Sequence, residues 1–250
     1  MKLDIKYNNT NNNFDNVNIW YKIGEGRSGV IYTINEDYVI KILKNGNRFE
    51  YDLYNNFIEI IKNDTISLKI GIPYCFGKLL EDYEEFTMKN KFLIFKRYKK
   101  LTLDKIKGRT KVDKIFRLIY TLLRVEKFLE NKINCVNLDI KLDNIMLDYN
   151  NNIKIIDLGL IKYFTIGDMF YSYNNYIIWP SGKCYLNSVP LYSIFIVICM
   201  LELSQTFVEE NNIFKLINTL KLQYKNKKLN TILNLLIKKK YDSQHVLNHF

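Results

Sequence analysis

Three glycines near the N-terminus have a spacing that suits a loop over phosphate groups. Gly24-Glu25-Gly26-Arg27-Ser28-Gly29 has the pattern G-x-G-x-x-G, and Val30-Ile31 follows it. A helix after such a loop would favour a dinucleotide-binding unit, whereas the β-branched residues here favour a strand and a glycine hairpin over nucleotide phosphates. For this motif taken alone, a simple hairpin turn is the alternative interpretation.

A lysine follows on a stretch that is otherwise apolar enough to be buried, Tyr38-Val39-Ile40-Lys41. One interpretation is that Lys41 contacts nucleotide phosphates and pairs with a helix glutamate; the other is that it reaches water from the end of a strand. Glu50 and Glu59 are the candidate partners, and at about 100° per residue they point to opposite sides of one helix. Glu50 is preferred because it lies beside the apolar stripe, although Glu59 has the more usual separation from Lys41.

The most informative residues lie in the middle of the chain, in the segments Asn137-Leu138-Asp139-Ile140-Lys141-Leu142-Asp143-Asn144 and Ile153-Lys154-Ile155-Ile156-Asp157-Leu158-Gly159. A single Asp or Asn of this kind commonly serves a turn or a helix cap. Together, Asp139, Lys141 and Asn144 reproduce the D-x-K-x-x-N of the catalytic loop of the eukaryotic-type protein kinases. The second segment resembles their D-F-G motif and the strand before it, with Leu158 in place of Phe.

This resemblance covers residues 20 to about 203 and implies a role for each of these side chains. Asp139 would accept the proton of the acceptor hydroxyl, and Lys141 would neutralise charge on the transferred phosphoryl group. Asn144 and Asp157 would supply oxygen ligands to Mg²⁺, with Mn²⁺ as a second candidate ion. Lys41 would complete the catalytic set. The expected ATP-binding residues are Ile23, Gly24, Gly26, Gly29, Ile31, Val39, Lys41, Glu50 and Phe95, with Phe95 or Ile94 controlling the depth of the adenine pocket.

The hydrophobic pattern predicts a β-rich part followed by an α-rich part. Strands are expected at residues 19–23, 30–34, 38–43, 72–80 and 92–97, with one helix between the third and fourth of them. Later helices are expected at 112–131, 190–204, 211–222 and 228–239. The predicted fold class is α+β, in a kinase-like two-lobe fold. A flexible Asn-rich arm at 1–16 would precede a small antiparallel β lobe at 17–98 and a mainly α-helical large lobe at 99–250.

Several residues depart from the family pattern. Asn137 and Leu138 replace the His and Arg that usually precede the catalytic Asp, and Leu138 cannot bind a phosphate, so control by phosphorylation of the activation segment is not expected. Trp179-Pro180-Ser181 stands where A-P-E is expected. Pro190 occupies the place of the Asp that normally begins the central helix and holds the catalytic loop. These losses concern the support of the site.

Composition narrows the setting. The 250 residues are 48% apolar, and the four cysteines are scattered without the spacing of a zinc site or a disulfide framework. The N-terminus lacks the pattern of a signal peptide, and the longest apolar run, Ile194 to Leu201, is shorter than the roughly 20 residues of a membrane span. The net charge of +11 is spread along the chain, so it gives no clear nucleic-acid or membrane signal. An intracellular, cytoplasmic location is expected, in a host cell if the chain is viral or an effector.

The leading hypothesis is a serine/threonine protein kinase, because a lysine two places after the catalytic Asp is typical of that branch. A pseudokinase scaffold and a small-molecule kinase of the aminoglycoside-phosphotransferase type are the alternatives. The expected partners are ATP and a protein substrate. A basic stretch from Lys96 to Lys114 is interpreted as a solvated face, with docking of an acidic protein as the sharper hypothesis.

Overall fold

The computed structural model describes residues 1–9, 12–44, 49–172, 182–203, 226–238 and 240–250. The chain is mixed α+β and divides into two compact units, Met1–Tyr98 and Lys99–Phe250. The division falls at the residue where the sequence predicts the change from strands to helices. Each unit is described by itself.

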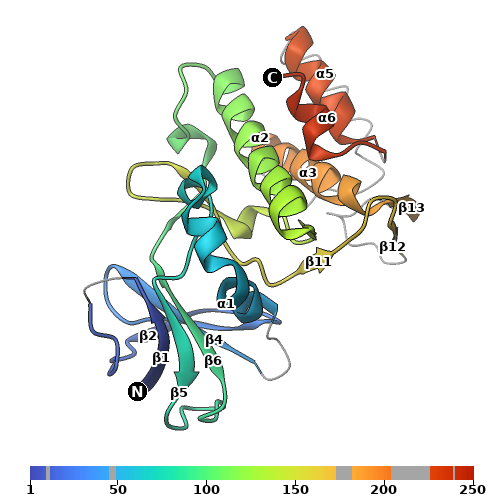
Figure 1. The fold of residues 1–250 in the computed structure, drawn as a ribbon. Coiled ribbons are helices and arrows are strands. Elements are labelled where there is room, and N and C mark those ends of the chain that lie inside the picture. The colour runs from blue at the N-terminus through green and yellow to red at the C-terminus, as the bar shows by residue number, and fades with distance from the viewer. Residues whose placement is uncertain (10–11, 45–48, 173–181, 204–225, 239) are drawn as a thin grey trace. The chain divides into compact units, whose positions relative to one another are not determined.

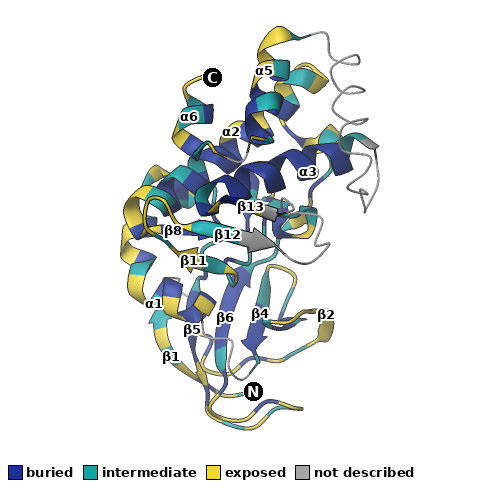
Figure 2. Ribbon diagram, turned by 90° about the vertical axis from the view of Figure 1, so that its right-hand side faces the viewer, coloured by how far each residue is buried: buried dark blue, intermediate teal, exposed yellow. Residues whose placement is uncertain are grey.

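The first unit is built on a six-stranded antiparallel sheet with the order β1-β5-β6-β4-β3-β2 (Figure 1). Its central strands are mainly buried, and the edge strands β1 and β2 carry exposed residues (Figure 2). The five strands predicted from the sequence are confirmed, with shifts of a few residues at their ends. The strands are β1 Leu3–Asn8, β2 Tyr21–Glu25, β3 Gly29–Thr33, β4 Tyr38–Leu43, β5 Cys75–Leu79 and β6 Lys91–Lys96.

The sixth strand, β1, corrects the expectation of a flexible arm over residues 1–16. Leu3 lies opposite Leu79, and Ile5 lies opposite Gly77, in an antiparallel pair of β1 with β5. Gly77 permits this approach, because a Cβ there would lie 1.9 Å from the carbonyl oxygen of Asp4. Leu3 is buried, as is Phe14 farther along the segment. The asparagines around these apolar residues obscure a strand whose side chains alternate.

The two faces of the sheet are covered by different parts of the unit. Helix α1, Phe49–Lys62, packs on one face, where the ring of Tyr51 lies 5.5 Å from that of Phe76 and the ring of Tyr54 lies 6.1 Å from that of Phe95. A 3-10 helix, η1, follows at Thr65–Leu68. Phe14 and Val17 belong to the hydrophobic cluster on the opposite face, so the N-terminal segment completes the core.

The second unit is mainly helical, with short strands between the helices. Helix α2, Lys111–Phe128, begins at a capping box in which Thr110 and Asp113 satisfy each other's backbone N–H groups. It continues through one π-helical turn, η3, Leu129–Ile133, and ends at Asn134, whose φ of 55° is left-handed. The chain then enters the strand β8, Cys135–Asn137, which leads directly to Asp139.

Two more of the later predicted helices are confirmed, whereas the last short helix and most of the short strands of this unit were not predicted. Helix α3, Val189–Leu203, is mostly apolar and is buried from Val189 to Met200 (Figure 2). Helix α5, Lys227–Leu236, confirms the helix expected at 228–239, with a start one residue earlier and an end three residues earlier. The helix expected at 211–222 lies outside the described residues. The other elements are β7 Lys99–Lys100, η2 Leu103–Lys105, η4 Leu142–Asn144, β9 Ile145–Leu147, β10 Ile153–Ile155, β11 Ile161–Tyr163, β12 Met169–Ser172, β13 Gly182–Tyr185, η5 Leu186–Ser188 and α6 Ser243–Leu247.

No helix in the described ranges is long and apolar enough to cross a lipid bilayer. The four cysteines are buried.

The pairing of β1 with β5 can be tested at Gly77. We expect Gly77→Ala to lower the free energy of unfolding by about 1–3 kcal/mol, because the added methyl group would overlap the backbone at Asp4. Gly26→Ala is the matched control, since no atom lies within 4 Å of a Cβ at that position. Urea unfolding measures both. A loose N-terminal arm would instead make Gly77→Ala neutral or slightly stabilising.

Candidate active site

The first unit gathers most of the predicted ATP-binding residues on one face of its sheet. Gly24 lies opposite Ile31, and Ile31 lies opposite Lys41. Val39 lies opposite Phe95. Residues that lie opposite one another, and residues two apart in a strand, share a face of the sheet. One face therefore carries Gly24, Ile31, Val39, Lys41 and Phe95. Ile31 and Val39 are only half-buried, so this apolar face is not fully covered.

The glycine segment forms a hairpin between β2 and β3. The N–H of Gly26 donates to the carbonyl oxygen of Gly29 at 2.9 Å, and a strand rather than a helix follows. This excludes the dinucleotide-binding βαβ interpretation. Gly29 is required by packing, since a Cβ there would lie 2.4 Å from the carbonyl oxygen of Ile42. Ile23 lies at a bulge of β2 and is exposed, and Gly26 lies in the turn with open space beside it.

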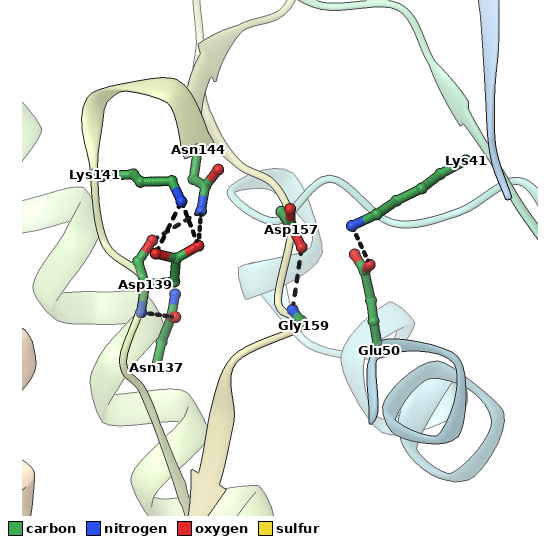
Figure 3. A network of polar contacts seen from close by, with 8 residues as sticks. All are labelled: Lys41, Glu50, Asn137, Asp139, Lys141, Asn144, Asp157 and Gly159. Atoms are coloured by element: carbon green, nitrogen blue, oxygen red, sulfur yellow. Dashed lines mark hydrogen bonds and ion pairs between the residues drawn. The ribbon is translucent and has the colours of Figure 1, made fainter. Parts of the chain in front are cut away.

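Lys41 forms a buried ion pair with Glu50. The Nζ of Lys41 lies 2.6 Å from a carboxylate oxygen of Glu50, and the two side chains are 5% and 1% exposed (Figure 3). Glu50 is in the first turn of α1, whereas Glu59 is 66% exposed and lies 3.8 Å from Lys62. The structure therefore selects Glu50 of the two candidate glutamates as the partner of Lys41.

In the second unit, two side chains from the same loop hold the carboxylate of Asp139 (Figure 3). Lys141 donates to both carboxylate oxygens, at 2.7 and 3.0 Å. The amide nitrogen of Asn144 donates to one of these oxygens at 2.8 Å and to the Asp139 backbone carbonyl at 2.9 Å. These contacts fix the orientation of the carboxylate, whose side chain stays 13% exposed.

The hairpin of β9 and β10 places Asn144 and Asp157 at the same end of its two strands. Asn144 directly precedes β9, and Asp157 comes shortly after β10, with Ile145 opposite Ile155 in the antiparallel pair. The N–H of Ile156 donates to the carbonyl oxygen of Asn144 at 2.9 Å. The order and pairing of these strands therefore hold the two predicted metal ligands together.

The backbone of Asp157 is strained. Its φ is 55°, in the left-handed region that residues with a side chain seldom adopt, and its carboxylate accepts the N–H of Gly159 at 3.3 Å. Such strain is retained where the surrounding structure imposes it, often at functional sites. Leu158, which replaces the usual Phe, is fully buried.

Asn144 and Asp157 carry side-chain oxygen atoms of the kind that could hold a magnesium ion. Asn144 uses its amide nitrogen on Asp139, so its oxygen faces away from that carboxylate. Within the described ranges no group of three or more His, Cys, Asp or Glu side chains could hold a metal by itself. Mg²⁺ commonly takes one or two protein ligands and completes its shell with phosphates and water. Asn144 and Asp157 satisfy that requirement.

Three residues hold the segment before Asp139. The sequence marked Asn137 and Leu138 only as departures from the family pattern, and it did not mark Glu126. Leu138 is buried in a cluster with Val136, Cys184, Leu186 and Val189. Asn137 is fully buried, and its N–H donates to Glu126 of α2 at 3.2 Å. Glu126 was not among the predicted site residues. A glutamate on the apolar face formed by Leu122 and Leu129 is the signal that could have identified it.

Comparison of the sequence with protein-family models and with curated proteins finds no match.

Trp179-Pro180-Ser181 lies outside the described residues. Pro190 lies in the first turn of α3, a position that a proline accommodates without losing a helical hydrogen bond.

The choice of Glu50 over Glu59 predicts different costs for two similar substitutions. Glu50→Ala leaves Lys41 with its charge in a buried site, so we expect the free energy of unfolding to fall by about 3–5 kcal/mol. Glu59→Ala removes an exposed carboxylate from the same helix and should change it by no more than about 0.5 kcal/mol. Denaturant titration of the two variants measures the difference. Equal costs would contradict the pairing.

Proposed function

We propose that the chain is an ATP- and magnesium-dependent protein kinase that transfers the γ-phosphate to serine or threonine hydroxyls. One observation carries the proposal: Lys141 and Asn144 orient the carboxylate of Asp139, and the same Asn144 is tied by its backbone to Ile156, next to Asp157. Phosphoryl transfer requires such a set of a proton acceptor, a neutralising cation and metal ligands in fixed positions. In this proposal Met1–Tyr98 is the small lobe and Lys99–Phe250 the large lobe.

In the proposed reaction, Asp139 orients the attacking hydroxyl and accepts its proton. The hydroxyl oxygen forms a bond to the γ-phosphorus, the bond from that phosphorus to the bridging oxygen breaks, and ADP leaves. A partly exposed carboxylate held by two donors suits this task, because its free lone pairs can face an incoming hydroxyl. Lys141, which already contacts Asp139, neutralises charge on the transferred group.

Asn144 and Asp157 would hold Mg²⁺, and their oxygen atoms match its preference for hard ligands. When bound, the ion neutralises charge on the phosphates of ATP. Its expected location beside Asp139 follows from the hydrogen bond between the Asn144 amide and that carboxylate.

The first unit contributes the proposed nucleotide-binding face. Lys41 carries a positive charge fixed by Glu50, and such a charge can pair with the α- and β-phosphates. The half-buried Ile31 and Val39 share the face of Lys41 and offer an apolar surface for the adenine base. The glycine hairpin between β2 and β3 would lie over the phosphates in this proposal. A cytoplasmic location belongs to the same proposal, because a kinase needs a supply of ATP.

The proposal predicts a specific loss of activity at Asp139. With Mg²⁺, labelled ATP and generic acidic or basic proteins, we expect Asp139→Asn to lower kcat by about 10²- to 10⁴-fold. Asp143→Asn is the matched control, because Asp143 lies in the same loop but is exposed. We expect its kcat to stay within about threefold of the wild-type value, since a surface substitution of this kind removes no contact to Asp139.

Other outcomes select other functions. Equal phosphate incorporation by the wild type and Asp139→Asn would contradict the proposal. Stabilisation by nucleotide without turnover would indicate a pseudokinase scaffold, and transfer to small molecules alone would indicate a small-molecule kinase.

A further inference from the structure

A buried glutamate lies beneath the loop that carries Asp139. Glu126 of α2 is 0% exposed, and its Oε2 accepts the backbone N–H of Asn137 at 3.2 Å. Its Oε1 is also buried and has no hydrogen-bond partner among the residues that the structure describes. Glu126 thus contacts the loop through one oxygen atom at the residue where β8 ends.

Asn137 links Glu126 to Asp139, because its backbone bonds to the first and its side chain to the second. Its side chain is fully buried, and its Oδ1 accepts the N–H of Asp139 at 2.9 Å (Figure 3). Three residues therefore form one series of hydrogen bonds, from the carboxyl of Glu126 to the backbone of Asn137 and from the side chain of Asn137 to the backbone of Asp139. The series ends at the residue whose carboxylate Lys141 and Asn144 orient.

The position of β8 explains why this N–H requires a side-chain acceptor. Strand β8 pairs with β11 in a two-stranded sheet, and the next residue, Leu138, donates its N–H to Leu160. Because successive N–H groups of a strand point to opposite sides, the N–H of Asn137 faces away from β11. A buried N–H without an acceptor costs about 1–3 kcal/mol, and Glu126 supplies that acceptor.

Burying the carboxyl group of Glu126 is energetically unfavourable. Burial raises the pKa of its carboxyl group well above the ordinary value, and the nearby Glu130 adds to the effect. An apolar side chain would pack among Leu122, Leu123 and Leu129 without this cost. The contact with Asn137 gives a physical reason for a carboxyl group at this position.

The start of α3 offers no substitute for this contact. The resemblance to protein kinases implies an Asp at the beginning of that helix that holds the catalytic loop, but Pro190 stands there and the first turn of α3 contains no acidic residue. In this chain the acceptor comes from α2.

We infer that Glu126 is a positioning residue that holds the Asn137–Asp139 segment, and through it the carboxylate of Asp139, in the geometry required for phosphoryl transfer. The catalytic consequence rests on the proposed function, whereas the hydrogen bonds that carry the inference belong to the fold.

Glu130 provides a control, because it is a partly buried glutamate in the next turn of the same helical segment. It lies four residues after Glu126, and its carboxylate accepts the hydroxyl of Ser243 in α6 at 2.6 Å. Burial raises its pKa to about 7. Glu130 lies in η3, which continues α2, and its carboxylate contacts α6 rather than the loop.

The first experiment needs no enzymatic activity. Hydrogen exchange of a peptide covering residues 134–147 is compared in the wild type, Glu126→Met, Glu126→Gln and Glu130→Met. We expect Glu126→Met to exchange about tenfold faster at the protected amides, because methionine fills the space but accepts no N–H. Glu126→Gln retains an acceptor oxygen and should keep the protection, as should Glu130→Met. Unchanged exchange in folded Glu126→Met would overturn the inference.

The second experiment measures steady-state kinetics of the same variants. We expect Glu126→Met to lower kcat by about 10- to 100-fold with KM for ATP within about twofold, because the loop is misplaced while the nucleotide-binding residues are intact. Glu126→Gln should recover most of kcat, and Glu130→Met should retain it. A role limited to stability would lower the melting temperature of Glu126→Met and leave kcat unchanged, which would also overturn the inference.

Two further outcomes remain decisive. If Glu126→Met does not fold, Glu126→Asp takes its place, since its shorter side chain draws the carboxylate away from Asn137 and should produce the same faster exchange. If the wild type transfers no phosphate, the proposed function fails, and the exchange experiment alone still decides whether Glu126 holds the loop.

Discussion

The need to satisfy polar groups that lie at the edge of an apolar core governs the second unit. The carboxylate of Asp139 can be oriented by Lys141 and Asn144 only if the loop that carries all three is itself fixed. The loop has little regular structure, so its backbone depends on neighbours: Asn137 contacts Glu126, and Asn144 accepts the N–H of Ile156. Each contact gives one polar group a hydrogen-bond partner and restrains one end of the loop.

The elements that local patterns encode could be predicted from the sequence. Alternating and continuous apolar runs identified five strands of the first sheet, and the spacing of apolar residues identified α2 and α3. The sequence narrowed the partner of Lys41 to Glu50 or Glu59 and favoured Glu50, which lies beside the apolar stripe; the structure decided between them. These predictions require only the residues of one element.

The features that the sequence did not reveal depend on residues far apart in the chain. Strand β1 forms because Gly77, more than seventy residues later, lets its backbone approach, and no local pattern records that space. The position of Glu126 on the apolar face of α2 is a local signal, but its partner, the N–H of Asn137, is known only once β8 is placed beside it. Non-local pairing therefore decided both the extent of the sheet and the support of the candidate site.

Asn137 and Leu138, which depart from the kinase pattern, both restrain the segment before Asp139. An Arg before the catalytic Asp can respond to a phosphate, but Leu138 packs in the cluster with Val136, Cys184, Leu186 and Val189. Two contacts thus restrain the segment before Asp139: the apolar packing of Leu138 and the hydrogen bond from the N–H of Asn137 to Glu126. Neither contact depends on an added charge. If the chain is a kinase, these residues favour a catalytic loop held by the fold itself, whose geometry does not depend on phosphorylation.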